Sequence, residues 1–177
     1  MEEHLVVTFK LHFPANVQGL CLLESALFDL GSRLPRAFSP LFEAWHASIH
    51  LRPGVPPYEL WFQLSVHPSL VDSLVDSVHA ALTAEGPRMG FQCARPVPMT
   101  EPEAFGEGDP RPGYDVYTAT GADRMPDLWK QVQLATEWAL EDLRKGALRA
   151  LPATMDLAWA RHIYEENLMG LLQVRTP

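Results

Sequence analysis

Three segments in the first 66 residues alternate between apolar and polar side chains, which is the pattern of a β-strand with one buried face. Odd-numbered positions are apolar in residues 5–13 and 45–52, and even-numbered positions are apolar in residues 58–66. Pro14 ends the first segment. The turn sequence RPGVPP, residues 52–57, joins the second segment to the third, so we expect these two strands to pair as a hairpin.

Two further segments repeat apolar residues at intervals of three and four, which indicates helices with one buried stripe. They span residues 17–30 and 70–82. Asn16 fits the N-cap of the first helix, and Gly31 fits a left-handed C-cap that ends it. The Gly-Pro pair at 86–87 is expected to end the second helix.

With a further strand expected at 89–97, the elements follow the order strand, helix, strand, strand, helix, strand. This order is that of the split βαβ, or ferredoxin-like, arrangement, an antiparallel sheet with two helices on one face. Each helix has one apolar stripe and each strand one apolar face, so a single interface can bury both. The sequence therefore predicts an α+β fold with a ferredoxin-like βαββαβ sheet.

The remainder of the chain adds a strand and two helices to this arrangement. Residues 98–113 form a loop rich in Pro, Gly and acidic residues, and residues 114–120 are expected to form an edge strand. One helix is predicted to start near Pro126 and another after Pro152. We expect this C-terminal helical pair to lie over the second face or the edge of the sheet.

A length of 177 residues suits a single domain. We therefore treat residues 1–177 as one α+β domain. It consists of a core at 4–97, the acidic loop at 98–113 and a strand and helical extension at 114–177.

The charge balance restricts the partners that the protein can have. The chain has 14 Lys and Arg against 22 Asp and Glu, a formal net charge of −8. Such a surface repels phosphate backbones, so we do not expect nucleic-acid binding, and a basic protein partner is favoured. The first residues lack a basic signal segment and no apolar run is long enough to span a bilayer, so we expect a cytoplasmic protein without a membrane role. Cys21 and Cys93 have no metal-binding spacing and are expected to be reduced, buried thiols.

Residues 45–52, WHASIHLR, contain the chain's strongest candidate chemistry. His46, Ser48, His50 and Arg52 share the polar side of the expected strand, where an imidazole can act as acid or base while a hydroxyl holds an oxygen of the substrate. We expect this side to face solvent. His46 and His50 could also hold a zinc ion with a third ligand, but such spacing is common by chance, so we expect no metal site and no cofactor.

The same stretch takes part in a short repeat. Residues 46–49 and 67–70 both read His-x-Ser-apolar, which is similar to the motif that the two-histidine phosphoesterases place on paired strands. In this chain the two motifs lie too close together to occupy corresponding strands. Pro68 also fits the first turn of a helix better than a strand.

Two surface features favour binding to another protein. The loop carries Glu101, Glu103, Glu107 and Asp109, which would suit a cationic partner, and Trp61 lies on the polar side of the third strand. Trp61 is expected either to be covered by the C-terminal helices or to contact a partner.

No nucleophile elbow, phosphate-binding loop or His-Glu-x-x-His motif is present, so a binding module is favoured over an enzyme. The leading hypothesis is an acidic protein-binding module, for example an immunity or inhibitor protein that occludes a basic toxin or enzyme. One alternative is a small-ligand-binding protein or a hydrolase or phosphoesterase-like enzyme that uses the His46, Ser48, His50 and Arg52 face. Another is a structural subunit of a larger assembly. The pattern also allows a homodimer.

Overall fold

The computed structural model describes residues 4–52, 55–98, 113–117, 125–146, 151–155 and 157–175. It confirms the α+β class, with an antiparallel sheet and four helices in the described part of the chain. The elements are β1 (His4–Phe13), α1 (Val17–Phe38), the 3-10 turn η1 (Ser39–Leu41), β2 (Ala44–Arg52), β3 (Val55–Val66), the 3-10 turn η2 (Pro68–Leu70), α2 (Val71–Met89), β4 (Gln92–Cys93), β5 (Gly113–Tyr117), α3 (Met125–Lys145) and α4 (Ala158–Arg175).

The long strands pair in the order β2-β3-β1, and both short strands pair with β1 on its other side. All of these pairs are antiparallel. β5 lies opposite the first half of β1 and β4 opposite its end, so the two share one edge of the sheet. The predicted strands at 5–13, 45–52 and 58–66 are therefore confirmed, with the expected hairpin between the last two.

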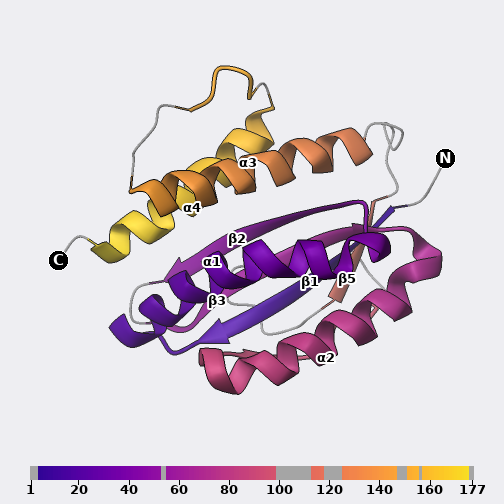
Figure 1. Ribbon diagram of the computed structural model, residues 1–177, viewed down its shortest axis with the longest axis horizontal. Coiled ribbons are helices and arrows are strands. Elements are labelled where there is room, and N and C mark those ends of the chain that lie inside the picture. Colours follow the sequence, from indigo (N-terminus) through magenta and orange to yellow (C-terminus); the bar gives the residue numbers. More distant parts are fainter. Residues whose placement is uncertain are drawn as a thin grey trace.

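The apolar residues of the alternating strands face α1 and α2. Phe9, Phe62 and Ala47 are register partners in a row across β1, β3 and β2, and all three are buried in the main core. α1 and α2 run side by side across this face of the sheet (Figure 1). The apolar faces of the strands and the apolar stripes of the helices thus meet in one interface, as the spacing of apolar residues in each element predicts.

Helices α3 and α4 pack against each other and against the edge strand β2 (Figure 1). The backbone N–H of Trp45 donates to Oε1 of Gln133 on α3, at 3.2 Å. The side-chain amide of Asn167 on α4 donates to the backbone carbonyl of Ala47, at 2.7 Å. Both backbone groups belong to the outer side of β2, so side chains of the helical pair satisfy hydrogen bonds that another strand would otherwise make.

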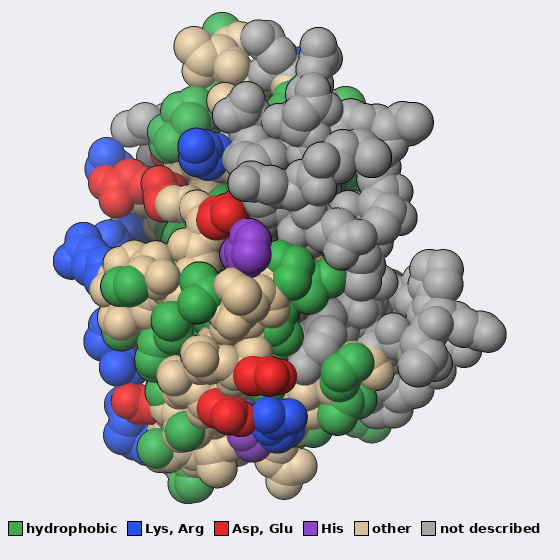
Figure 2. All heavy atoms as spheres, turned by 90° about the vertical axis from the view of Figure 1, so that its right-hand side faces the viewer, with side chains coloured by type: hydrophobic (Ala, Val, Ile, Leu, Met, Phe, Trp, Pro, Cys, Tyr) green, Lys and Arg blue, Asp and Glu red, His purple; other side chains and the backbone are tan. Residues whose placement is uncertain are grey.

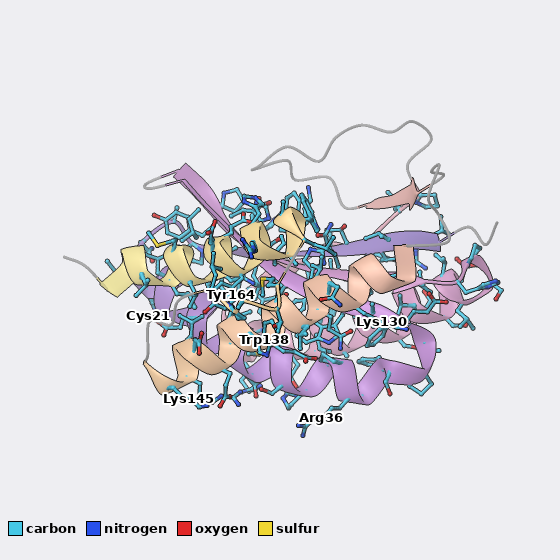
Figure 3. All side chains as sticks on the ribbon, turned by 90° about the horizontal axis from the view of Figure 1, so that it is seen from above. Cys21, Arg36, Lys130, Trp138, Lys145 and Tyr164 are labelled. Atoms are coloured by element: carbon cyan, nitrogen blue, oxygen red, sulfur yellow. The ribbon has the colours of Figure 1, made fainter. Side chains whose placement is uncertain are left out.

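A buried polar contact holds the helical pair together. Tyr164 of α4 donates its hydroxyl to the carboxylate of Asp142 on α3, and both side chains are buried. Seen from above, Tyr164 lies between the two helices (Figure 3). A hydroxyl that donates to a buried carboxylate offsets the cost of removing that charge from water.

The first residue of α1 lies where the sequence predicts it, but the helix ends later than predicted. Oδ1 of Asn16 accepts from the backbone N–H of Gly19 at 2.8 Å, which confirms the predicted N-cap. The predicted end at Gly31 is wrong, because α1 continues through Pro35 to Phe38. A Cβ at Gly31 would lie 3.0 Å from Cδ1 of Leu140, so this glycine serves the close packing of α1 against α3.

The second helix also runs further than predicted. α2 passes through Gly86 and Pro87 to Met89, and Gly90, with φ of 77°, forms the left-handed C-cap. The strand expected at 89–97 is reduced to the two residues of β4 because the helix occupies its first positions.

The fifth strand, the two cysteines and the absence of a membrane-spanning segment were also predicted from the sequence. β5 is Gly113–Tyr117, so the fifth strand exists, while the last residues of the expected 114–120 segment lie outside the described residues. Cys93 is mostly buried, as expected, and this burial raises the pKa of its thiol to about 12. Cys21 was also expected to be buried, but this prediction is wrong because Cys21 is exposed on α1. No helix among the described residues is long and apolar enough to cross a membrane.

Candidate functional site

The face of the sheet opposite α1 and α2 carries a group of polar side chains, which we call the polar cluster. The strand register places its members in three rows across β1, β3 and β2, because residues opposite one another in an antiparallel pair point to the same side. The rows are Thr8, Gln63 and His46; Lys10, Trp61 and Ser48; and His12, Glu59 and His50.

Most of the polar cluster is buried. His46 is fully buried and Ser48 is 3% exposed, so the prediction that this side of β2 faces solvent is wrong for both. Lys10 and Glu59 are buried as well. The alternation correctly separates the two sides of the strand, but it does not say whether the polar side meets water. Arg52 is the last residue of β2, and its side chain is outside the described part of the structure.

Ser48 and His50 form a hydrogen-bonded pair on β2. The hydroxyl oxygen of Ser48 lies 2.9 Å from Nε2 of His50, as expected for residues i and i+2 on one side of a strand. The other ring nitrogen of His50, Nδ1, lies 3.9 Å from Oε1 of Glu166 on α4. Hydroxyl, imidazole and carboxylate therefore follow one another in the order used by serine nucleophiles, although the carboxylate is beyond hydrogen-bonding distance.

Burial keeps both imidazoles of β2 neutral. It lowers the pKa of His50 to about 4; Glu59 acts in the opposite direction, and Lys10 lowers it further. Burial also lowers the pKa of His46 to about 3, against the opposing effect of a hydrogen bond with Gln63. His50 is neutral at pH 7 and so has a lone pair to accept a proton from Ser48, but a pKa of about 4 makes it a weaker base than a free imidazole.

Trp61 lies at the centre of the polar cluster. Its ring stacks on that of His50 with centroids 3.9 Å apart, and Nζ of Lys10 lies 4.5 Å from the Trp61 ring centre. Trp61 is only 5% exposed, so it is buried and not left on the surface. The indole fixes the orientation of the His50 ring and places a cation on the same aromatic system.

The first and third strands supply charged residues that the sequence reasoning missed. His12 and Glu59 approach to 3.0 Å between Nε2 and Oε1, and Lys10 lies in the neighbouring row. The signal was present, because these residues occupy the polar positions of strands whose alternation was recognised. Glu166 carried no such signal, since it lies on a helix near the other end of the chain.

The metal hypothesis gains no third ligand from the structure. Within the described ranges, no group of three His, Cys, Asp or Glu side chains is arranged to hold a metal ion. The acidic residues Glu101, Glu103, Glu107 and Asp109 lie outside the described residues.

A separate groove of about 620 Å³ lies between α1 and α3, away from the polar cluster. Trp45 lines it together with both basic and acidic side chains, Arg36 and Arg144 on one hand and Glu43 and Glu137 on the other. Arg36 projects away from the molecule (Figure 3). Because both signs of charge line the groove, it does not select a ligand of either sign.

Comparison of this chain with protein-family models, with curated proteins and with solved structures finds no match. The chemistry that this chain can perform is therefore inferred from the geometry of the polar cluster.

Proposed function

We propose that the protein is a small hydrolase in which Ser48 is the nucleophile and His50 is the general base. The observation that carries the proposal is the 2.9 Å contact between the Ser48 hydroxyl and Nε2 of an imidazole that burial keeps neutral. Glu166 is close enough to orient the imidazole after a small movement, at 3.9 Å from Nδ1. Burying this many polar groups costs stability, and such clusters are commonly retained for function.

The proposed reaction is the hydrolysis of an ester. The Ser48 oxygen attacks the carbonyl carbon while its proton moves to Nε2 of His50. When the bond to the leaving oxygen breaks, His50 returns this proton to the departing alcohol. Water, deprotonated by His50, then attacks the acyl group on Ser48, releases the acid and restores the serine hydroxyl.

We propose that a substrate reaches Ser48 from the side of His50 and Glu166, the more exposed members of the group. Their side chains are 16% and 26% exposed, whereas Ser48 itself is almost completely covered.

The proposal is tested by labelling with a small fluorophosphonate, followed by intact-protein mass measurement and peptide mapping. We expect one adduct, located on Ser48, which is absent in Ser48→Ala and strongly slowed in His50→Gln. The chain provides a matched control, since His67 and Ser69 also make a His–Ser contact of 2.8 Å but are exposed. Ser69→Ala should label like the unmodified protein. Labelling at Ser69, or no labelling of a folded protein, would refute the proposal.

A second candidate function is an acidic, cytoplasmic protein-binding module that occludes a basic toxin or enzyme. It is supported by the formal net charge of −8 and by the absence of a recognised catalytic motif in the sequence. On the face seen in Figure 2, the described acidic, basic and apolar side chains are interspersed, so the acidic surplus is not concentrated there. Trp61 is not part of this surface because it is buried. A structural-subunit role, which an exposed Trp61 would have favoured, gains no support from the burial of this residue.

The binding module is tested by purification from the native host under low salt. We expect one cationic protein at equimolar ratio, released by moderate salt, and lost when Glu101, Glu103, Glu107 and Asp109 are replaced by Gln and Asn. Binding that survives both the salt and the substitutions would exclude electrostatic recognition by these residues.

We also infer that β1 to β4 form a ferredoxin-like unit. The inference is supported by β3 lying between β1 and β2, and by β1 lying between β3 and β4, which is what a split βαβ arrangement requires. The two-residue β4 and the additional β5 are the features that depart from a regular unit of this kind.

A further inference from the structure

A pocket of about 420 Å³ lies at the end of β1, where residues of β1, β3 and β4 and the C-cap of α2 meet. The described residues that line it are His12, Phe13, Pro14, Pro56, Pro57, Gly90 and Gln92. The volume falls within the range of small-molecule sites, and mostly apolar walls with a few polar groups are typical of such sites.

The walls of the pocket are fixed by the fold. Three of the lining residues are prolines, whose backbones have little freedom. Phe13 is buried and packs on Phe91 with ring centroids 5.7 Å apart. Gly90 has the left-handed φ that ends α2, and a Cβ there would lie 2.6 Å from Cδ1 of Leu22. The pocket is therefore formed without a ligand, which lowers the entropic cost of binding.

The pocket has one titratable group among its described lining residues, His12. Its Nε2 lies 3.0 Å from Oε1 of Glu59, which is completely buried behind it. In a neutral imidazole one ring nitrogen carries the proton and the other has a lone pair that a ligand hydroxyl can donate to. An imidazole supported by a carboxylate is able to accept a proton from a weakly acidic group of a ligand.

We infer that this pocket binds a small, largely apolar molecule that carries one weakly acidic hydroxyl, and that His12 pairs with this hydroxyl. The apolar part of this ligand contacts the three prolines and Phe13. The proton of the ligand hydroxyl moves to His12, which leaves an oxyanion on the ligand and an imidazolium on His12. The carboxylate of Glu59 balances the imidazolium charge. The inference does not depend on the proposed hydrolase, because Ser48 and His50 do not line the pocket.

The probe for this site is 4-nitrophenol, because its oxyanion absorbs visible light and its neutral form does not. At a pH where the free phenol is mostly neutral, addition of the protein should produce a saturable rise in oxyanion absorbance. His12→Gln should weaken binding by roughly tenfold or more, because the charge-assisted contact is removed. Ser48→Ala and the exposed-site control His67→Gln should bind as the unmodified protein does.

A second variant covers the case in which His12→Gln fails to fold. Gln92 is exposed at the mouth of the pocket on β4, so Gln92→Trp can fill the pocket with little effect on the core. It should abolish the absorbance change while circular dichroism remains that of the folded protein. No saturable signal with the unmodified protein, or an undiminished signal in folded Gln92→Trp, would overturn the inference. If fluorophosphonate labelling fails while 4-nitrophenol binding is normal, the proposed hydrolase function is wrong and the proposed ligand site at His12 stands.

Discussion

The buried imidazoles of β2 predict an unusually steep loss of stability between pH 7 and pH 5. In the unfolded chain His46 and His50 titrate near 6.5, whereas in the folded protein their pKa values are about 3 and about 4. Below pH 6.5 the unfolded state therefore binds protons that the folded state does not, so stability falls as the pH is lowered. Each pH unit costs about 1.4 kcal/mol per histidine once the unfolded form is protonated. Integrated from pH 7 to pH 5, each contributes about 2 kcal/mol and both together about 4 kcal/mol.

This loss is a large part of the ~5–15 kcal/mol that stabilises an ordinary domain, so it is readily measured. Urea unfolding followed by tryptophan fluorescence at pH 7, 6 and 5 gives the free energy of unfolding at each pH. The ion-paired carboxylates Asp29 and Glu85 have lowered pKa values, so the stability they contribute is lost only as the pH falls below their ordinary values of 3.8 and 4.5.

The variant His46→Gln separates the histidine effect from general acid sensitivity. It should be less stable at pH 7, but its loss from pH 7 to pH 5 should fall by about 2 kcal/mol relative to the unmodified protein. The exposed-histidine variant His67→Gln should retain the full loss. If His46→Gln shows the same pH dependence as the unmodified protein, then His46 is not buried in its neutral form and the description of the polar cluster is incorrect.

Three further substitutions test the packing of the helices, each by chemical denaturation. Gly19→Ala should destabilise by about 2 kcal/mol although alanine is the better helix former, because its Cβ would lie 1.7 Å from the Pro14 carbonyl oxygen; a stabilised variant would contradict this contact. Tyr164→Phe should cost about 1–3 kcal/mol by removing the donor to buried Asp142, and an unchanged stability would show that the hydroxyl is dispensable. Asn16→Ala should cost about 1 kcal/mol through loss of the cap on α1, whereas a loss below about 0.3 kcal/mol would rule out a significant capping contribution.

The strands could be predicted from the sequence because their signal is local. Alternation over nine or so residues fixes which side chains share a face, and it correctly put His46, Ser48 and His50 together on β2. The same reasoning applied to β1 and β3 would have added Lys10 and Glu59 once the register was known. Register depends on how strands meet, which a single segment does not encode.

The errors arose where distant parts of the chain meet. Gly31 has the sequence signature of a helix end, but contact with Leu140 of α3 explains the glycine, and the helix continues. Glu166 approaches His50 from a helix that could not be positioned against β2 in advance. The burial of the polar cluster was missed for the same reason, because exposure is a property of the whole fold.

The capping of β2 by Gln133 and Asn167 determines how this protein can associate with others. A partner that extends the sheet by adding a strand to β2 would first have to displace these two side chains from the backbone groups of Trp45 and Ala47. Removal of α3 and α4 by proteolysis or truncation would uncover a row of unsatisfied amides and carbonyls along β2. The shortened chain should then self-associate through that row, so the C-terminal helices protect the protein against strand-to-strand polymerisation.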